Sequence, residues 1–204
     1  MRKIFITGIG TNVGKTIVAA ILVEALEADY WKPVQAGNHY PTDSELIRLL
    51  ISNKKSIIHP EAYCFKNPLS PHAAASLEGK TILPEEIITP ATKNKILVIE
   101  GAGGLMVPLN ETFLMLDLIK QLKAALIIVV ENYLGSINHS LLTIAAAKEN
   151  NITIAGIVFN GASNLESEKI ILNYTKLQCL GNIKKAEKID KAFIITQAQQ
   201  FKNI

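Results

Sequence analysis

The chain has 204 residues, 49% of them hydrophobic, and a formal net charge of +3 at pH 7. This composition suits the buried core of an α/β protein, and we expect a single domain over residues 1–204. The small charge, without a run of lysine and arginine among aromatic residues, gives no indication of nucleic-acid binding. No apolar run could span a bilayer and no signal-peptide pattern opens the chain, so we expect a cytoplasmic protein. Cys64 and Cys179 lack metal-ligand spacing and are predicted to be reduced core thiols.

The first predicted elements are a strand over residues 4–7 and a helix that includes residues 17–23. Between them, residues 8–16 read GIGTNVGKT and fit the phosphate-binding pattern G-x-x-x-x-G-K-[ST], the P-loop. Backbone N–H groups of such a loop surround phosphate oxygens at the start of the helix. We expect Lys15 to reach the β- and γ-phosphates and the Thr16 hydroxyl to bind Mg²⁺. A glycine-rich turn with a chance lysine is the alternative, which the strand and helix disfavour.

A short strand is predicted next, over residues 30–34, with Pro33 ending its pairing just after Lys32. A lysine at this strand end is in a position to project towards the nucleotide. After a loop over residues 35–42, Asp43 and Ser44 resemble the N-cap region of a helix. Its predicted buried stripe is Leu46, Ile47, Leu49 and Leu50. For Asp43, helix capping and metal binding both remain open.

The region from residue 57 to 88 is predicted to hold loops and short helices. Pro71 suits the first turn of a helix that includes residues 73–77, and His72 is expected to pack or cap rather than catalyse. Residues 84–93 are predicted to form a further helix.

A continuous apolar strand over residues 95–100 ends in the carboxylate of Glu100. In P-loop proteins such a carboxylate at the tip of a core strand is a partner of Mg²⁺. The sequence GAGG follows at residues 101–104, and glycines allow a ligand to lie against the backbone. A tight structural turn is the alternative, and ligand contact is favoured.

The second half continues the alternation of strands and helices. The predicted strands are 124–130, 152–159 and 179–183, and the predicted helices lie within 110–123, 134–149 and 166–177 and near the C-terminus. Ser136 or Asn138 is a candidate cap of the middle helix, whose N-terminus is a potential anion site. Asn160, at a strand end before Gly161, either reads a nucleotide base or forms a turn. The whole pattern predicts a three-layer P-loop fold, with a mostly parallel central sheet flanked by helices.

Several motifs occur in order along the chain as far as residue 161: TGIGTNVGKT (7–16), KPV (32–34), SPH (70–72), EGAGG (100–104), LGSINH (134–139) and Asn160. Together they resemble the dethiobiotin synthetases of biotin biosynthesis. The P-loop is shared by many families, whereas KPV, EGAGG and G-x-INH in this order are more specific.

This resemblance implies an ATP-dependent cyclo-ligase that acts on 7,8-diaminononanoate and CO₂. A carbamate formed on one amine attacks the γ-phosphate, and the second amine then closes the ureido ring and releases phosphate. Lys15, Lys32 and Mg²⁺ would supply the positive charge that two anionic reactants need. The resemblance also implies a homodimer, with the substrate carboxylate near residues 136–138 of the partner chain. The alternative is that Asn138 caps its own helix.

The resemblance further implies sets of site residues. It gives catalytic roles to Thr11, Lys15 and Lys32, and Mg²⁺ binding to Thr16, Asp43 and Glu100. The implied ATP contacts are Asn12, Val13, Gly14, Lys15, Thr16, Ile17, Asp43, Glu100, Gly101, Ala102, Gly103, Asn160 and Gly161. The implied substrate contacts are Ala36, Ser70, Ser136, Ile137 and Asn138.

Three positions depart from the family pattern. Asn12 replaces a residue that is usually acidic, Ala36 replaces a usual serine or threonine, and residues 181–185 lack the proline of an Ile-Pro segment near the base. Two other functions remain open: another P-loop synthetase, or a nucleotide-switch ATPase of the partitioning type. The switch ATPases carry an extra signature lysine early in the P-loop, where this chain has Ile9 and Gly10.

Overall fold

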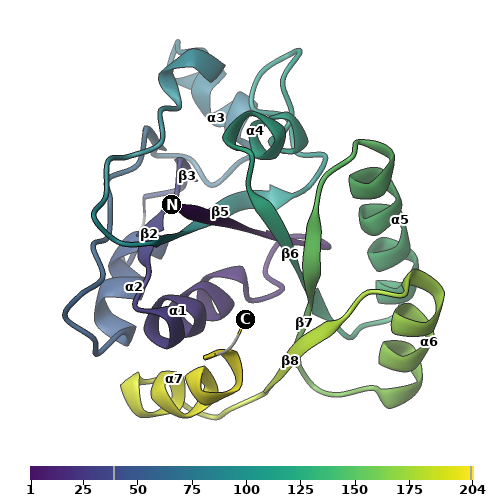
Figure 1. Ribbon diagram of the computed structural model, residues 1–204. Coiled ribbons are helices and arrows are strands. Elements are labelled where there is room, and N and C mark those ends of the chain that lie inside the picture. The colour runs from purple at the N-terminus through teal and green to yellow at the C-terminus, as the bar shows by residue number, and fades with distance from the viewer. Residues whose placement is uncertain (39, 203) are drawn as a thin grey trace.

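The computed structural model describes residues 1–38, 40–202 and 204, and its centre is a parallel β-sheet (Figure 1). Within these residues the sheet has six strands, in the spatial order β2 (Asp29–Trp31), β5 (Ile96–Gly104), β1 (Arg2–Gly8), β6 (Ala125–Glu131), β7 (Ile154–Gly161) and β8 (Cys179–Lys184). Each neighbouring pair is parallel. The carboxyl ends of these strands therefore lie at one edge, where ligands bind in open α/β sheets.

Helices cover both faces of this sheet, as Figure 1 shows. On one side α1 (Lys15–Leu26) packs against α2 (Asp43–Leu50) and α7 (Lys191–Ala198). On the other side α5 (Ser136–Glu149) packs against α6 (Leu165–Thr175), and α4 (Met115–Leu122) contacts β5. The predicted three-layer fold is therefore confirmed. None of the helices in the described ranges has the length and apolar character needed to cross a membrane.

Burial of the central strands explains why their sequences are unbroken apolar runs. Ile4, Phe5 and Ile6 of β1 are fully buried, and so are Leu97, Val98 and Ile99 of β5. A strand that is covered by helices on both faces has no solvent-facing side, so its sequence does not alternate.

The predicted strand over residues 30–34 is wrong in one respect: it is two strands in two sheets. β2 ends at Trp31, and β3 (Val34–Ala36) pairs with β4 (Tyr63–Phe65) in a small separate sheet. Pro33 has no N–H to continue a ladder, so the chain leaves the main sheet there. Lys32 consequently lies in the break between the two sheets, and the loop expected from residue 35 begins only after Ala36. Residue 39 of that loop lies outside the described residues.

Several local predictions also need correction. Residues 84–93 contain only the 3₁₀ turn η1 (Pro84–Glu86), followed by irregular chain. The cap of α2 is Thr42, which forms a reciprocal capping box with Glu45, whereas Asp43 is the first helical residue. Leu49 is half exposed because helical spacing puts it opposite Ile47 and Leu50, which are buried.

The two smaller helical segments lie at the margins of the fold. α3 (Pro71–Leu77) begins with its proline as predicted, and η2 (Gln199–Phe201) follows α7. Cys64 and Cys179 are free thiols as expected. The prediction that both are core residues is wrong for Cys64, whereas Cys179 is partly buried and packs against the core. Cys64 is exposed because the flanking position Phe65 takes the inward face of β4.

A buried carboxylate holds the start of β2. Asp29 accepts hydrogen bonds from the backbone N–H of Ile57 (2.8 Å) and from Asn94 Nδ2 (2.5 Å), and its Oδ2 lies 3.0 Å from His59 Nε2. The Thr92 hydroxyl also donates to it. Burial by itself raises the pKa of Asp29, but these donors outweigh it, so the pKa lies below its usual range.

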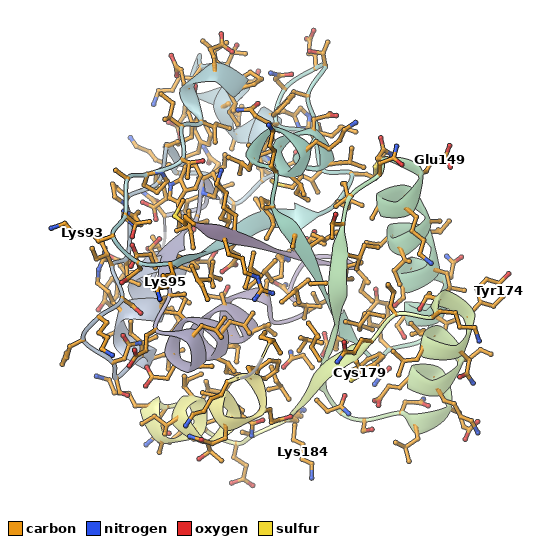
Figure 2. All side chains as sticks on the ribbon, viewed as in Figure 1. Lys93, Lys95, Glu149, Tyr174, Cys179 and Lys184 are labelled. Carbon is orange, nitrogen blue, oxygen red and sulfur yellow. The ribbon has the colours of Figure 1, made fainter. Side chains whose placement is uncertain are left out.

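We expect Asp29→Asn to lower the free energy of unfolding at pH 7 by about 2 kcal/mol, because buried donors lose a charged acceptor. Because the pKa of Asp29 is lower in the folded than in the unfolded chain, the ionised carboxylate stabilises the fold at pH values above the ordinary aspartate pKa of about 3.9. This stabilisation is lost as the pH falls through the lower pKa of the folded state. Urea unfolding measured from acid to neutral pH should therefore show that the variant loses less stability on acidification than the wild type. Glu149→Gln is the control, since Figure 2 shows Glu149 projecting at the far end of α5. Equal acid losses in wild type and Asp29→Asn would contradict this account.

Candidate functional site

The phosphate-binding loop joins the end of β1 to the start of α1. Gly14, the residue before α1, has a φ of 88°, a left-handed conformation that favours glycine. A Cβ atom at this position would also overlap the side-chain amide of Asn160. Asn12 has a φ of 62°, and asparagine is one of the few residues that adopts this region readily. The loop conformation therefore depends on residues of these types, and it presents the N-terminus of α1 to the sheet edge.

Lys15 spans the loop. Its Nζ donates a hydrogen bond to the Gly10 carbonyl at 3.0 Å, and the side chain is 7% exposed. Burial lowers the pKa of Lys15, and the negative charge of Glu100 opposes this only in part. A phosphate would offer this ammonium a stronger, charged acceptor than the carbonyl that it holds here.

Three oxygen-bearing side chains converge beside the loop. Thr16 Oγ1 lies 3.0 Å from Asp43 Oδ1 and 2.9 Å from Glu100 Oε1. Carboxylate and hydroxyl oxygens are the ligand type that Mg²⁺ prefers, so this set fits that ion. Within the described ranges no group of three or more His, Cys, Asp or Glu residues could hold a metal. A magnesium ion here would therefore need phosphate oxygens and water to complete its shell, as is usual for nucleotide-bound Mg²⁺.

Lys32 reaches the same carboxylates from the break after β2. Its Nζ lies 2.6 Å from Asp43 Oδ2 and 3.1 Å from Glu100 Oε1, and its side chain is 4% exposed. Burial lowers the pKa of Lys32, but the two carboxylates outweigh burial and raise it. For Asp43 both effects have the opposite direction: burial raises its pKa, but Lys32 and Thr16 outweigh burial and bring the pKa below its usual range. The site therefore holds a buried Lys32 ammonium beside an ionised Asp43, and the same nitrogen donates to Glu100 Oε1.

Tyr30 also belongs to this cluster, although its sequence position suggested only the start of a strand. Its hydroxyl donates a hydrogen bond to Glu100 Oε2 at 2.9 Å, and the residue is fully buried. Burial, reinforced by the charge of Glu100, raises the pKa of Tyr30 well above its usual value, so the phenol keeps its proton. The available signal was the spacing: Tyr30 and Lys32 are two residues apart, which would put them on one face of the predicted strand over residues 30–34.

A cavity of 710 Å³ opens above these residues. It brings together most of the predicted site: Thr11, Asn12, Gly14, Lys15, Thr16, Ile17, Lys32, Ala36, Asp43, Ser70, Glu100, Ala102 and Gly103. Its other lining residues were not predicted: Gln35, Leu46, Pro68, Leu69, Pro71 and Val107. Val13 of the loop and Gly101 of β5 are buried and do not line the cavity.

Gln35 is notable among the residues that were missed. It lies next to Ala36, and its Nε2 donates to the Gly37 carbonyl at 2.8 Å. Its Oε1 is buried and has no hydrogen-bond partner among the described residues. A buried acceptor of this kind costs free energy until a donor reaches it.

A second cavity, of 210 Å³, lies on the other side of Ile17, which lines both. Its lining includes the predicted residues Asn160 and Gly161, and the segment Ile183–Lys185 that lacks the family's proline. Figure 2 shows Lys184 projecting outward from the end of β8. The amide nitrogen of Asn160 donates to the Val13 carbonyl at 3.0 Å, so this side chain braces the phosphate-binding loop. The sequence had suggested a base contact or a turn, and the brace was not foreseen.

The predicted residues at the start of α5 line neither cavity. Ser136 is buried, whereas Ile137 and Asn138 are exposed. Gly135 is the N-cap, and in the described part of the chain no side chain caps this helix. The alternative that Ser136 or Asn138 caps its own helix is therefore wrong.

Two solved structures illustrate the likeness of fold. The septum site-determining protein MinD of Pyrococcus horikoshii OT3 has a TM-score of 0.61 at 16% identity, covering 99% of this chain and 96% of that one. A ParA family ATPase from Chlorobium tepidum TLS has a TM-score of 0.60 at 13% identity, covering 98% and 92%. At such identities the likeness shows a shared fold and nothing about the reaction.

Sequence relatives are much closer. A family model described as an AAA domain matches residues 2–192. An ATP-dependent dethiobiotin synthetase of Cytophaga hutchinsonii is 53% identical over 198 residues, which cover 97% of this chain and 96% of that protein. The same enzyme of Christiangramia forsetii is 45% identical over 201 residues, with 98% and 96% covered. The chain belongs to the ATP-dependent dethiobiotin synthetases, which are ligases of biotin biosynthesis.

Proposed function

We propose that the chain performs its family's reaction in the larger cavity: it uses Mg²⁺-ATP to join 7,8-diaminononanoate and CO₂ into the ureido ring of dethiobiotin. One observation carries this assignment most directly. Two lysines from different elements, Lys15 and Lys32, line the same 710 Å³ cavity with the pair Asp43 and Glu100. A pure nucleotide switch needs the first lysine, whereas joining an anionic carbamate to a phosphate also needs the second.

The chemistry needs little from the protein beyond charge and position. A carbamate oxygen attacks the γ-phosphorus and ADP leaves. The second amine then attacks the carbamate carbon; the bond between this carbon and the bridging oxygen breaks, and the oxygen leaves as part of phosphate. Loop N–H groups and Lys15 hold the phosphates, and Lys32 faces the incoming carbamate and offsets its charge. Mg²⁺ held by Thr16, Asp43 and Glu100 would stabilise negative charge on the phosphate oxygens.

The two cavities suit the two ends of the nucleotide. We assign the phosphates to the larger cavity, beside Thr11, Asn12 and the loop, and the base to the smaller one, beside Asn160 and Gly161. Ile17 would lie under the ribose between them. The side-chain carbonyl of Asn160 remains free to accept a hydrogen bond from an amino group of the base, because the bond to the Val13 carbonyl uses only the side-chain nitrogen.

The diamine would lie across Ala36 and Ser70 in the larger cavity. Ala36 has no hydroxyl, and the neighbouring Gln35, whose Oε1 has no donor among the described residues, would supply an acceptor in its place. An amine N–H is the donor that this oxygen lacks.

We also propose that the enzyme is a cytoplasmic homodimer, each chain one domain. Support comes from the surface at the start of α5: Tyr133, Leu134, Ile137 and Leu142 are all at least 36% exposed, and Leu134 is fully exposed. Free N–H groups at this helix end would meet the substrate carboxylate in the partner's cavity.

Mixed dimers test the shared site. Lys32→Ala and Asn138→Glu are each expected to be inactive, the second because its carboxylate repels that of the substrate. Equal amounts refolded together should recover roughly a quarter of wild-type activity, since half the dimers are hybrid and half their sites are intact. Hybrid dimers that form but recover nothing would mean that each site is built from one chain.

The reaction itself is tested by substrate dependence. Release of ADP by the purified protein should require both 7,8-diaminononanoate and bicarbonate, and dethiobiotin should appear in equal amount. Release of ADP at the same rate without the diamine would contradict the assignment and favour a nucleotide switch.

A further inference from the structure

Glu100 is held from two directions by side chains on one face of the sheet. In the pairing of β2 with β5, Tyr30 lies opposite Val98, and Glu100 is two residues further along β5. Side chains two residues apart point to the same face, so Tyr30 and Glu100 are diagonal neighbours. Thr16 and Lys32 donate to Glu100 Oε1, while Tyr30 alone among the described residues donates to Oε2.

We propose that Tyr30 is a positioning residue: its hydroxyl orients the Glu100 carboxylate so that Oε1 faces Thr16, beside which the nucleotide's Mg²⁺ would be held. This inference rests on the metal role proposed for Glu100. The carboxylate is 1% exposed, and without a donor at Oε2 it could rotate towards other partners or draw in water. Groups one step removed from a metal orient its ligands in this way.

The chemical nature of the donor matters. A lysine or arginine in place of Tyr30 would add a positive charge beside the proposed metal ligands, whereas a phenol donates to Oε2 and adds no charge. Tyr30 is 0% exposed, so its hydroxyl does not itself contact substrate or nucleotide.

The test is binding of a non-hydrolysable ATP analogue, measured by calorimetry with Mg²⁺ and again with EDTA. Tyr30→Phe keeps the ring and removes the hydroxyl. It should weaken Mg²⁺-dependent binding about tenfold, change binding in EDTA less than twofold, and raise the Mg²⁺ concentration for half-maximal activity about tenfold. The matched control is Tyr63→Phe, another phenol that donates to a carboxylate, that of Glu86, outside the cavity. It should change none of these three quantities by more than twofold.

Two further variants separate the possible failures. Glu100→Gln should weaken Mg²⁺-dependent binding, and adding Tyr30→Phe to it should cause no further loss. If Glu100→Gln has no effect, the proposed metal role fails, and this inference fails with it. If Glu100→Gln weakens binding but Tyr30→Phe stays within twofold of wild type, only the positioning role is wrong. Tyr30→Leu removes the ring as well; loss in this variant alone, or equal loss with and without Mg²⁺, would show that Tyr30 only packs.

Discussion

Lys15→Ala is expected to reduce turnover to less than about a thousandth of the wild-type rate while the protein remains folded. The ammonium is the only charged donor that the phosphate-binding loop itself contributes, and its present partner is a neutral carbonyl of the same loop. Removing it therefore takes charge from the transferring phosphate and leaves no buried charge unpaired. ADP release under saturating substrates measures the effect, and thermal unfolding checks the fold.

Lys3→Ala is the matched control for this variant. Lys3 also donates to a backbone carbonyl, that of Leu122, at 3.0 Å, but it lies outside both cavities. Its removal should leave turnover within a factor of two. Turnover of Lys15→Ala within tenfold of wild type would contradict the phosphate-binding assignment.

Lys32→Ala should lower kcat roughly a hundredfold or more, which corresponds to about 2.7 kcal/mol of transition-state stabilisation. Affinity for Mg²⁺-ATP should fall far less, because the loop, Lys15 and the proposed magnesium ligands remain. The variant should also be less stable without ligands, by about 3 kcal/mol, since Asp43 and Glu100 lose their shared cation. Mg²⁺ should restore part of that stability.

Single-turnover rates and nucleotide titrations separate these effects. Lys80→Ala is the control, because its salt bridge with Glu78 is exposed and lies outside the cavities. It should be active and stable. A Lys32→Ala enzyme that loses ATP binding but keeps its kcat would show that this lysine is only a nucleotide ligand.

The sequence by itself was enough for the phosphate-binding loop and for the place of Glu100 on a core strand. The prediction that the strand ends at Glu100 is wrong, because β5 continues to Gly104 and residues 101–104 are strand. The loop motif, the apolar strand before it and the helix after it are contiguous, and local backbone chemistry determines their conformation. Glu100 was found because it ends an apolar run, and parallel strands bring their carboxyl ends to one edge. The order of motifs also pointed to the family to which the relatives of 53% and 45% identity belong.

Only the tertiary structure decided which distant side chains meet. The break at Pro33, which puts β2 and β3 in different sheets, places Lys32 between Asp43 and Glu100. Strand order and register bring Tyr30 to Glu100, and they result from packing of the whole chain, since a shift of one residue would turn every side chain to the other face. The same applies to Asn160, which braces a loop 147 positions earlier in the chain. Local spacing in the sequence specifies a motif, whereas long-range pairing of strands decides which side chains surround it. The partners of Glu100 are determined by this long-range pairing.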